Sequence, residues 1–230
     1  MDKLDLYNVR IPASTDSYSA VSHQNIIEAV YEHLDKRNLQ VVNEKYNVAA
    51  NGDKVIGYFD MNYMGNSEMG MRLAFRNSYD KSMSVAFVAG TQVFICSNGC
   101  ISGEIQFLRK HTGSVLTELN NKIVTTIEQL EDHFLRIEKH SIQMKSIELP
   151  KIKAAELYGR MFMVEDIISP TQLSIVKKEL NEPTHKVFEE ETLWSAYNHV
   201  TFALKEAHPL NYINQHVNLH KFVEAEYQLV

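Results

Sequence analysis

Between Arg72 and Glu104 the sequence places two apolar runs around a polar turn, and this stretch limits the choice of fold more than any other part of the chain. The first run, residues 70–79, has apolar side chains at positions 71, 73 and 75, with Arg72 and Arg76 on the alternate positions. Because successive side chains of a strand point to opposite faces, both arginines fall on one face of a β-strand. The second run, residues 83–96, follows the turn directly, so the pair predicts neighbouring strands of an antiparallel meander.

Two elements are predicted before this meander. Residues 39–50 and 54–64 are strand-like and flank Asn51-Gly52-Asp53, which supplies residues that accept positive φ, so they predict an antiparallel hairpin. A helix is predicted after Ser22, whose hydroxyl can cap it, because apolar residues recur at helical spacing: Ile26, Ile27, Val30, Tyr31 and Leu34. Residues 1–20 are rich in Ser, Asp and Tyr, and we expect an extended arm that pairs late or only on assembly.

The chain after residue 113 has helical periodicity. Residues 114–140 contain no Pro or Gly and repeat apolar residues at steps of three and four, which predicts one helix of roughly 26 residues, about 39 Å long. One apolar face packed on the sheet is the favoured interpretation, and a helical partner is the alternative. Further helices are predicted at 152–163, after Ser169, at about 189–207 and at 212–227. Ser169 is the predicted N-cap of its helix, and Gln172 can complete a capping box with it.

These elements predict an α+β fold, in which an antiparallel β-meander of four to five strands packs on a long helix and is followed by a helical C-terminal region. A chain of 230 residues can hold one large domain or a core with an extension. We expect residues 1–148 to form the α+β core with its N-terminal arm, and residues 149–230 to form a helical extension packed on that core.

Charge is unevenly distributed along the chain. The net charge is −6, and residues 179–230 alone hold eight acidic side chains against three basic ones. This balance argues against a broad phosphate-binding surface, because affinity for a nucleic-acid backbone comes mainly from Lys and Arg residues that displace counterions. A local basic stripe is compatible with it.

The sequence contains no run of the roughly 20 apolar residues that a membrane-spanning helix needs. Its N-terminus lacks the basic start and apolar segment of a secretory signal. The two cysteines, Cys96 and Cys100, are too few for a disulfide framework and are predicted to be core thiols. We therefore expect a cytoplasmic protein that does not act at a membrane.

Signatures of catalysis are missing from the sequence, including the phosphate-binding loop with its lysine, the serine-hydrolase elbow and the zinc-protease helix. The best metal candidate is His216, His220 and Glu224, whose i, i+4 spacing lines one face of a helix. A solvated helix face explains this spacing better, so we expect no metal, no cofactor and no catalytic residue. An enzyme or metal protein with an unrecognised site is an alternative.

One concentrated set of basic residues is interleaved with two aromatic residues. Guanidinium and ammonium groups track phosphates while aromatic rings stack on bases, so this mixture is typical of a protein that binds single-stranded polynucleotides. The alternative is a solvated sheet face that is neutralised by nearby acids, Asp60, Glu68 and Asp80. We expect the cationic side chains of this set to gather on a single solvent-facing strip. The predicted nucleic-acid-binding residues are Arg72, Arg76, Tyr79, Lys81, Phe107, Arg109 and Lys110.

Three motifs resemble, in order and spacing, the hallmarks of the phage- and plasmid-borne family of unknown function numbered nine-three-two: Asn77–Ser82, Val93–Gly99 and Leu193–Leu204. The first motif of that family usually reads Asn-Ser-His-Asp-Gly-Ser. The resemblance covers roughly residues 60–225. This chain departs from the family after Val200, where it lacks an amide and an acid, and at four motif positions where His, Gly, Phe and Arg are common: Tyr79, Lys81, Tyr197 and His199.

The resemblance implies a bacteriophage or other mobile-element origin and a genetic neighbourhood devoted to DNA replication and recombination. The predicted order of helix, hairpin, further strands and long helix is also similar to the core of single-strand annealing proteins, whose subunits form rings or filaments. Our leading expectation is a non-enzymatic homo-oligomer that binds or anneals single-stranded DNA in the cytoplasm of a host cell. The alternative is a factor that binds a host defence or replication protein through its acidic C-terminal helices.

Overall fold

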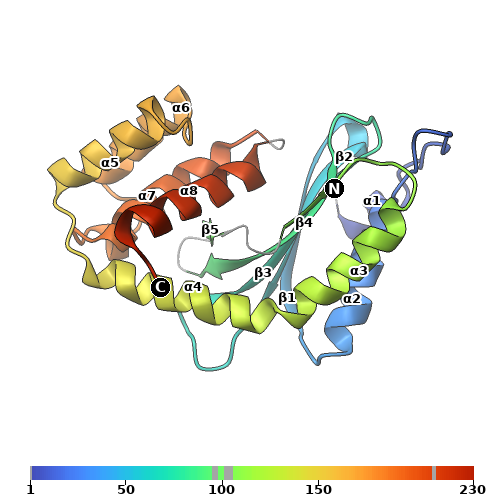
Figure 1. The fold of residues 1–230 in the computed structure, drawn as a ribbon, viewed down its shortest axis with the longest axis horizontal. Helices are drawn as coiled ribbons and strands as arrows, with labels where there is room; N and C mark the ends of the chain where they lie inside the picture. The colour runs from blue at the N-terminus through green and yellow to red at the C-terminus, as the bar shows by residue number, and fades with distance from the viewer. Residues whose placement is uncertain (1, 95–97, 101–105, 209–210) are drawn as a thin grey trace. The chain divides into compact units, whose positions relative to one another are not determined.

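The protein has an α+β fold built on an antiparallel sheet (Figure 1). The computed structural model describes residues 2–94, 98–100, 106–208 and 211–230, with the backbone alone for 98–100 and 106. The strands are β1 (Val41–Ala49), β2 (Lys54–Met61), β3 (Met69–Ser78), β4 (Val85–Val93), β5 (Asn98–Cys100) and β6 (Gln106–Arg109).

Neighbouring strands follow the order β1-β2-β3-β4-β5, and β6 pairs with β4 as well. β6 pairs with residues 85–88 of β4 and β5 pairs with residues 91–93, so these two short strands share the position beside β4. The predicted α+β class is confirmed, together with the antiparallel meander and the helical C-terminal region.

Contacts divide the chain into two compact units. The first unit is Met1–Asn66, Gly70–Gly90 and Glu104–His133, and the second is Ser67–Met69, Thr91–Gly103 and Phe134–Val230. The division into domains at residue 148 stays a prediction. Each unit is described by itself below.

The first unit begins with a helix, so the prediction of an extended arm over residues 1–20 is wrong at its start. In α1 (Lys3–Tyr7) the carboxylates of Asp2 and Asp5 each accept a hydrogen bond from the other residue's backbone N–H. Leu6 of this helix is buried. A capped turn forms because two aspartates three residues apart satisfy each other's backbone, a local pattern that the composition of the segment does not reveal.

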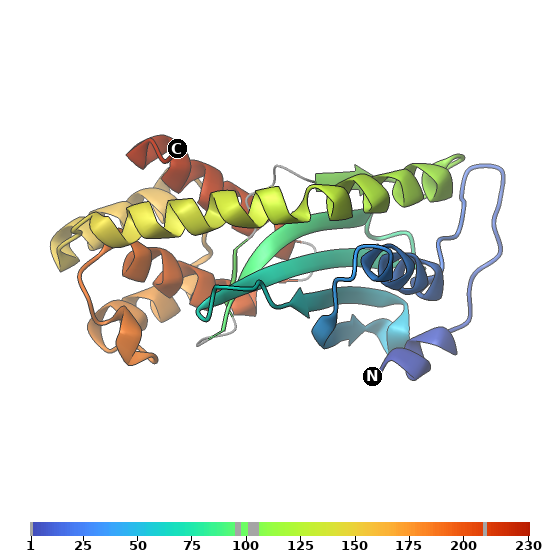
Figure 2. The ribbon, with the colours of Figure 1, turned by 90° about the horizontal axis from the view of Figure 1, so that it is seen from below.

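Helices α2 (His23–Asp35) and α3 (Val115–Glu128) lie side by side and cover one face of the sheet (Figures 1 and 2). The predicted cap of α2 is confirmed, because the Ser22 hydroxyl accepts a hydrogen bond of 2.9 Å from a backbone N–H of the first turn. Tyr31 of α2 meets Phe59 of β2 edge-to-face, with ring centroids 5.7 Å apart. These contacts form the core between the helices and the sheet.

β1 and β2 form the predicted antiparallel hairpin, which is closed by a 3₁₀ turn, η1 (Ala50–Gly52). Asn51 (φ 56°) and Gly52 (φ 100°) occupy the left-handed region that these two residue types tolerate best. Further along β2, a Cβ atom on Gly57 would lie 2.0 Å from the ring of Phe75, so this position admits only glycine. The turn and the close packing both depend on glycine.

The single helix predicted over residues 114–140 is two helices, α3 and α4 (Leu130–Ser146). They are separated by Gln129, whose backbone (φ −99°, ψ 4°) departs from helical values while its N–H still bonds to the carbonyls of Ile127 and Thr125. The apolar period continues through this turn, which is why the sequence pattern predicts one helix. The end of the helical region is also later than predicted.

Four helices make up the C-terminal region: α5 (Lys151–Met163), α6 (Pro170–Asn181), α7 (Leu193–Ala203) and α8 (Tyr212–Tyr227). The predicted capping box of α6 is confirmed by reciprocal hydrogen bonds between Ser169 and Gln172, 2.8 and 3.3 Å long. The bounds of α8 agree with the prediction. Capping chemistry and periodicity therefore predict these two helices well.

The helix predicted over residues 189–207 is shorter than expected. α7 begins after Thr192, whose hydroxyl accepts the Ser195 N–H at 3.2 Å, and it is flanked by the 3₁₀ turns η2 (Lys186–Phe188) and η3 (Leu204–Glu206). The cap at Thr192 agrees with the apolar stripe, which starts at Leu193, so the predicted start at residue 189 wrongly included the polar residues 189–191.

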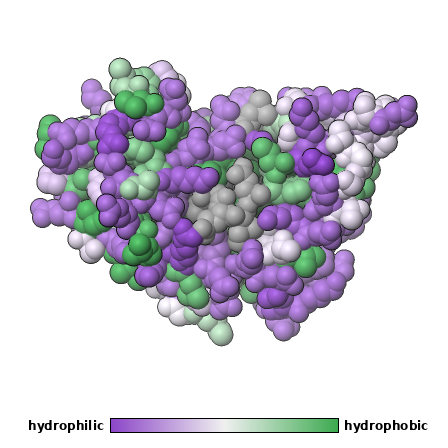
Figure 3. Space-filling view, viewed as in Figure 1, coloured by the Kyte–Doolittle hydropathy of each residue, from purple (hydrophilic) through white to green (hydrophobic). Residues whose placement is uncertain are grey.

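On the face of the molecule drawn in Figure 3, hydrophobic residues form separate small patches among hydrophilic ones. The exposed large hydrophobic residues are spread over many elements, for example Val42, Leu108, Ile152 and Met163. Within the described residues, no helix combines the length and the apolar character needed to cross a membrane.

Candidate functional site

Several strand ends of the first unit meet at one end of the sheet, because β1, β3 and β6 finish where β2 and β4 begin. The register pairs Lys54 with both Ala49 and Ser78, and it pairs Arg109 with Val85. We call this region the turn end of the sheet; it comprises residues 49–54, 78–85 and 109–111.

The turn between β3 and β4 is held by side chains that bond to its own backbone. The Ser78 hydroxyl accepts the Met83 N–H at 3.0 Å and donates to the Met83 carbonyl at 3.1 Å. Asp80 accepts hydrogen bonds from the Ser82 N–H (3.0 Å) and hydroxyl (2.6 Å) and pairs with Lys54 Nζ at 3.0 Å. Burial disfavours the Asp80 carboxylate, but these partners outweigh burial and hold its pKa at about 2.

A neutral histidine lies beneath this turn. Nδ1 of His23 is 3.0 Å from the Asn77 amide nitrogen, which can only donate, so Nε2 carries the ring proton and donates it to the Gly52 carbonyl at 2.9 Å. Burial lowers the pKa of His23 to about 4, although the bond to Gly52 opposes this effect. Tyr79 stacks on the imidazole at 4.0 Å, and its hydroxyl accepts the His23 backbone N–H at 2.9 Å.

The N-terminal segment is docked on the turn end. The Tyr18 hydroxyl donates to the Tyr79 carbonyl at 3.4 Å, and the Ser19 N–H donates to the His111 carbonyl at 2.9 Å. The Lys81 ammonium lies over the Tyr18 ring, 4.5 Å from its centroid. Tyr18 therefore packs within the single chain, so the expectation that the arm pairs only on assembly is wrong, while late pairing stays a prediction.

Four of the seven predicted nucleic-acid-binding residues meet at the turn end. Lys81 and Lys110 are exposed, and Arg109 is half-exposed while it pairs with Glu118 at 2.7 Å. Tyr79 is buried against His23, so its ring is not presented to solvent. The structure thus gathers cations at this site, but neither of the two predicted aromatic residues, Tyr79 and Phe107, presents an exposed ring there.

Two further cations, Arg10 and Lys54, lie at the same site and were missed by sequence reasoning. Arg10 is exposed and lines a surface cavity of about 430 Å³ together with Asp53 and Tyr79. Lys54 directly follows the predicted hairpin turn, so the hairpin alone was enough to place it there. No local pattern marks Arg10, because its position depends on how the N-terminal segment docks.

The remaining predicted residues lie elsewhere, and the expectation of arginines on a solvent-facing strip is wrong. Arg72 is 7% exposed, and its guanidinium forms two bonds with Asp60, Nε to Oδ1 at 2.6 Å and Nη2 to Oδ2 at 3.1 Å. Arg76 is 6% exposed and donates to the Ser84 carbonyl at 3.3 Å, while burial lowers its pKa. Phe107 is half-buried. Sequence alternation places the arginines on one face but gives no account of their burial.

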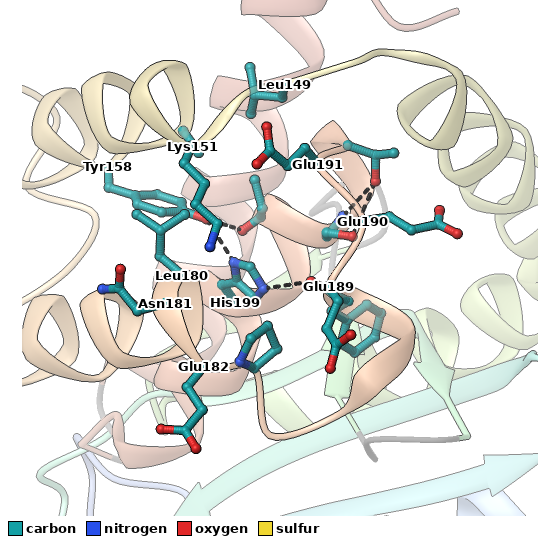
Figure 4. A pocket seen from close by; sticks show the side chains of 16 residues that line it. Leu149, Lys151, Tyr158, Leu180, Asn181, Glu182, Glu189, Glu190, Glu191 and His199 are labelled. Carbon is teal, nitrogen blue, oxygen red and sulfur yellow. Dashed lines mark hydrogen bonds between the residues drawn. The ribbon is translucent and has the colours of Figure 1, made fainter.

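A second candidate site is a pocket of about 320 Å³ in the second unit, bounded by α5, α7 and residues 180–192; we call it the α5–α7 pocket. Tyr158 and His199 meet in it (Figure 4), with the Tyr158 hydroxyl 3.0 Å from His199 Nδ1. His199 Nε2 is 3.1 Å from the Phe188 carbonyl. The lining also includes four glutamates, Glu182, Glu189, Glu190 and Glu191.

The hydrogen bonds of the pocket fix the position of each proton. The Phe188 carbonyl can only accept, so His199 carries its proton on Nε2 and Nδ1 accepts the Tyr158 hydroxyl proton. Burial raises the pKa of Tyr158 and lowers that of His199, so both side chains are neutral at neutral pH.

The predicted metal candidate does not form a site. His216 and His220 are fully buried, so the expectation of a solvated helix face is wrong for them. His220 Nε2 lies 3.1 Å from His140 Nδ1, and Glu224 forms an ion pair with Arg136. Within the part of the chain that the structure describes, no three His, Cys, Asp or Glu side chains are grouped to hold a metal ion.

Comparison with known protein families shows to which family the chain belongs. A family model described as "Domain of unknown function (DUF932)" matches residues 14–222, which is most of the chain. The chain belongs to the DUF932 family. No curated protein and no solved structure matches it. The predicted family membership is therefore confirmed, whereas the similarity to single-strand annealing proteins stays a prediction.

The first DUF932 motif forms the turn end. Lys81 occupies the position where the motif has glycine, and its φ of 63° lies in the left-handed region that favours glycine. Asn77 and Tyr79 of the same motif are the residues that hold His23. The motif therefore encodes a tight turn and its buried hydrogen-bond partners.

The third DUF932 motif forms α7 and one wall of the α5–α7 pocket. Trp194 and Tyr197 stack with centroids 5.9 Å apart, and His199 lies in the pocket. The second motif falls partly outside the described residues, as do Cys96 and the side chain of Cys100, which were predicted to be core thiols. Two of the three motifs thus map onto the two candidate sites.

Proposed function

We propose that this DUF932 protein binds single-stranded DNA through the turn end of its sheet. The observation that supports this proposal is the gathering of cations from separate parts of the sequence, Arg10, Lys54, Lys81, Arg109 and Lys110, at one end of the sheet. Clustered Lys and Arg side chains give affinity for a phosphate backbone by releasing counterions.

Three neighbouring acids limit the strength of this surface, and one of them, Asp53, lines the same surface cavity as Arg10. Asp80 pairs with Lys54 and Glu118 pairs with Arg109, so two of the five cations already have a carboxylate partner. Lys81 and Lys110 are exposed, and in this proposal they bind most of the phosphate groups. The proposed affinity is therefore modest and falls steeply as salt concentration rises.

The buried state of Tyr79 shapes the expected specificity. Its ring is stacked on His23, so base stacking by this residue has no support in the geometry. Binding through cations alone reads the backbone and not the bases. We propose binding that is tolerant of sequence, as annealing in phage recombination or replication requires, by a protein that forms oligomers.

Fluorescence anisotropy with a labelled oligothymidine at about 50 and about 200 mM salt tests the proposal. The double variant Lys81→Ala, Lys110→Ala should weaken binding and make the plot of log affinity against log salt shallower by about 0.7 for each phosphate that is no longer neutralised. Lys177→Ala, Lys178→Ala is the matched control, because it removes the same charge from exposed positions of α6. Absence of binding at the lower salt, or an equal loss in the control, would refute the proposal.

A second candidate function is favoured by the acidic residues around the α5–α7 pocket. We propose, as the alternative, that residues 179–230 bind a host defence or replication protein, since acidic helical surfaces attract basic partners. Removal of residues 208–230 is an unsuitable test, because α8 buries Ile213, Val217 and Val223 in the second unit. Charge reversal at the exposed Glu189 and Glu190 followed by co-purification from host cells tests it, and an unchanged set of partners contradicts it.

A further inference from the structure

The α5–α7 pocket is a preformed cavity between structural elements. Its volume of about 320 Å³ is at the lower end of the range of small-ligand sites. The lining includes six apolar residues that come from different elements: Leu149, Ala154, Leu180, Pro183, Phe188 and Ala196. The cavity can therefore hold a short aliphatic stem as well as a polar group.

The buried polar groups of the pocket offer an acceptor. The single hydroxyl proton of Tyr158 faces two acceptors, His199 Nδ1 at 3.0 Å and the Ala196 carbonyl at 3.4 Å, and the proton of His199 is used in its bond to the Phe188 carbonyl. The phenolic oxygen of Tyr158 keeps its lone pairs, while neither side chain has a further proton to give to a ligand. This neutral pair therefore suits a ligand that donates hydrogen bonds.

The charged side chains of the lining also favour a ligand that donates hydrogen bonds, and in particular a cation. The lining carries four glutamates and one lysine, Lys151, and in Figure 4 the carboxylates of Glu182 and Glu190 extend away from Tyr158 and His199. The remaining side-chain donors of the lining are neutral and belong to Asn181, Ser195 and Thr192, and the Thr192 hydroxyl donates to Ser195 Oγ at 3.2 Å. An anion would meet net negative charge here, whereas a cation would meet carboxylates on several sides.

The acidic loop is held in place by backbone hydrogen bonds. The Leu149 N–H donates to the Glu191 carbonyl at 2.7 Å, and the Leu193 N–H donates to the Ile147 carbonyl at 2.9 Å. Glu148 and Thr192 form an antiparallel bridge between these bonds. Because these bonds tie the loop to the segment before α5, the backbone that carries the glutamates is already positioned before a ligand arrives, which lowers the entropic cost of binding.

We propose that the α5–α7 pocket binds an organic cation, a guanidinium or alkylammonium group with a short aliphatic stem. The cation donates hydrogen bonds to the Tyr158 oxygen and is neutralised by the glutamates, while its stem contacts apolar residues of the lining. This site is independent of the proposed DNA-binding surface, which lies in the other unit.

Isothermal titration calorimetry of the full-length protein with N-propylguanidinium tests this proposal, and N-propylurea is the neutral control of nearly the same shape. We expect saturable binding of the guanidinium to one site and no binding of the urea at constant ionic strength. Equal binding of both probes, or no binding of the guanidinium, overturns the proposal.

A charge-matched pair of variants assigns the binding to the pocket. Glu189→Gln, Glu190→Gln, Glu191→Gln should weaken guanidinium binding roughly tenfold, because it removes three nearby charges while preserving side-chain size. Glu156→Gln, Glu165→Gln, Glu206→Gln removes the same net charge from exposed residues outside the lining and should leave binding unchanged. An equal loss in both triple variants would mean a general charge effect and would overturn the site.

The source of the cation is distinguished with two further probes. Tighter binding of an acetylated Gly-Arg-Gly amide than of spermidine assigns the site to a basic side chain of a protein partner, and the reverse order assigns it to a free polyamine. Either order supports a cation site, and failure of both probes overturns it. DNA anisotropy of the pocket triple variant should match that of its control, so failure of this proposal is distinct from failure of the DNA-binding proposal.

Discussion

The turn end and the α5–α7 pocket share one construction and differ in the sign of their charge. Each has a buried, neutral histidine whose two ring nitrogens are both engaged: His23 with Asn77 and Gly52, and His199 with Tyr158 and Phe188. Exposed lysines and arginines surround the first, and exposed glutamates surround the second. The comparison teaches that the neutral histidine holds the shape of a site while the surrounding charges decide which ligand it attracts.

The largest predicted effect comes from breaking the buried ion pair between Asp60 and Arg72 in the sheet. Asp60→Ala leaves the guanidinium of Arg72 buried without its carboxylate partner, and breaking a buried ion pair in this way costs about 3–5 kcal/mol. The free energy of unfolding in urea measures this loss. Glu156→Ala, which breaks the exposed pair with Lys153, is the control and should cost below about 1 kcal/mol.

A loss for Asp60→Ala as small as that of the control would mean that the buried pair does not support the sheet. The sheet that carries the turn end would then gain no stability from this ion pair, and the contrast between the sheet and the α5–α7 pocket would be weaker.

Acid should destabilise the protein through His23. Its pKa is about 4 in the folded state against an ordinary value of 6.5, so the unfolded state binds a proton more readily between these values. The stability present above pH 6.5 is lost as the pH falls toward 4, by about 3 kcal/mol for this residue, with no further loss from it at lower pH.

Urea unfolding of the unchanged protein and of His23→Gln at a series of pH values measures how much His23 contributes to the pH dependence of the free energy of unfolding. His23→Gln is less stable at neutral pH, and its free energy of unfolding depends less on pH. His208→Gln, a change at an exposed position, keeps the pH dependence of the unchanged protein. An identical slope for His23→Gln and the unchanged protein contradicts the neutral state assigned to His23.

Tyr158→Phe examines the corresponding bond in the pocket. The change removes the donor to His199 Nδ1 and leaves a buried acceptor unsatisfied, so we expect a loss of roughly 1–2 kcal/mol in the free energy of unfolding. Tyr63→Phe removes an exposed hydroxyl that bonds to Glu131 and should cost much less. Equal losses would show that the buried bond contributes no more than an exposed one.

Lys81→Gly has the smallest predicted effect. It separates the contribution of the backbone conformation at residue 81 from the contribution of its charge. Glycine relieves the cost of a positive φ, so stability should rise by roughly 0.5–1 kcal/mol while DNA affinity falls. Lys81→Ala removes the same charge without this relief and serves as the comparison. A thermal-unfolding midpoint that is no higher for the glycine variant than for the alanine variant goes against the strain assigned to this turn.

Much of the fold follows from local pattern. The α2 cap at Ser22, the hairpin turn at Asn51-Gly52 and the capping box of α6 each depend on residues close in sequence, and all three form as predicted. Gln129 shows the limit of this reasoning, because the apolar period continues across a break in the helix that only the backbone geometry reveals.

The candidate sites were predicted less completely. The motif Asn77–Ser82 marked the turn end, and alternation placed Arg72 and Arg76 on one face. The docking of Arg10 and the role of His23 depend on interactions between residues that are tens of positions apart. The α5–α7 pocket was not predicted, because its lining comes from three helices and a loop and has no linear signature.

The sequence by itself determined the type of most elements, the alternation of β3, the charge imbalance of residues 179–230 and the DUF932 motifs, since each is a property of neighbouring residues or of composition. Only the tertiary structure decided which charges are buried and which are exposed. Arg72 is buried because the strand register places Asp60 opposite it, and Lys81 is exposed because the turn projects beyond the sheet. Burial and ion pairing depend on partners brought together by folding, and for this reason they decide what each site can bind.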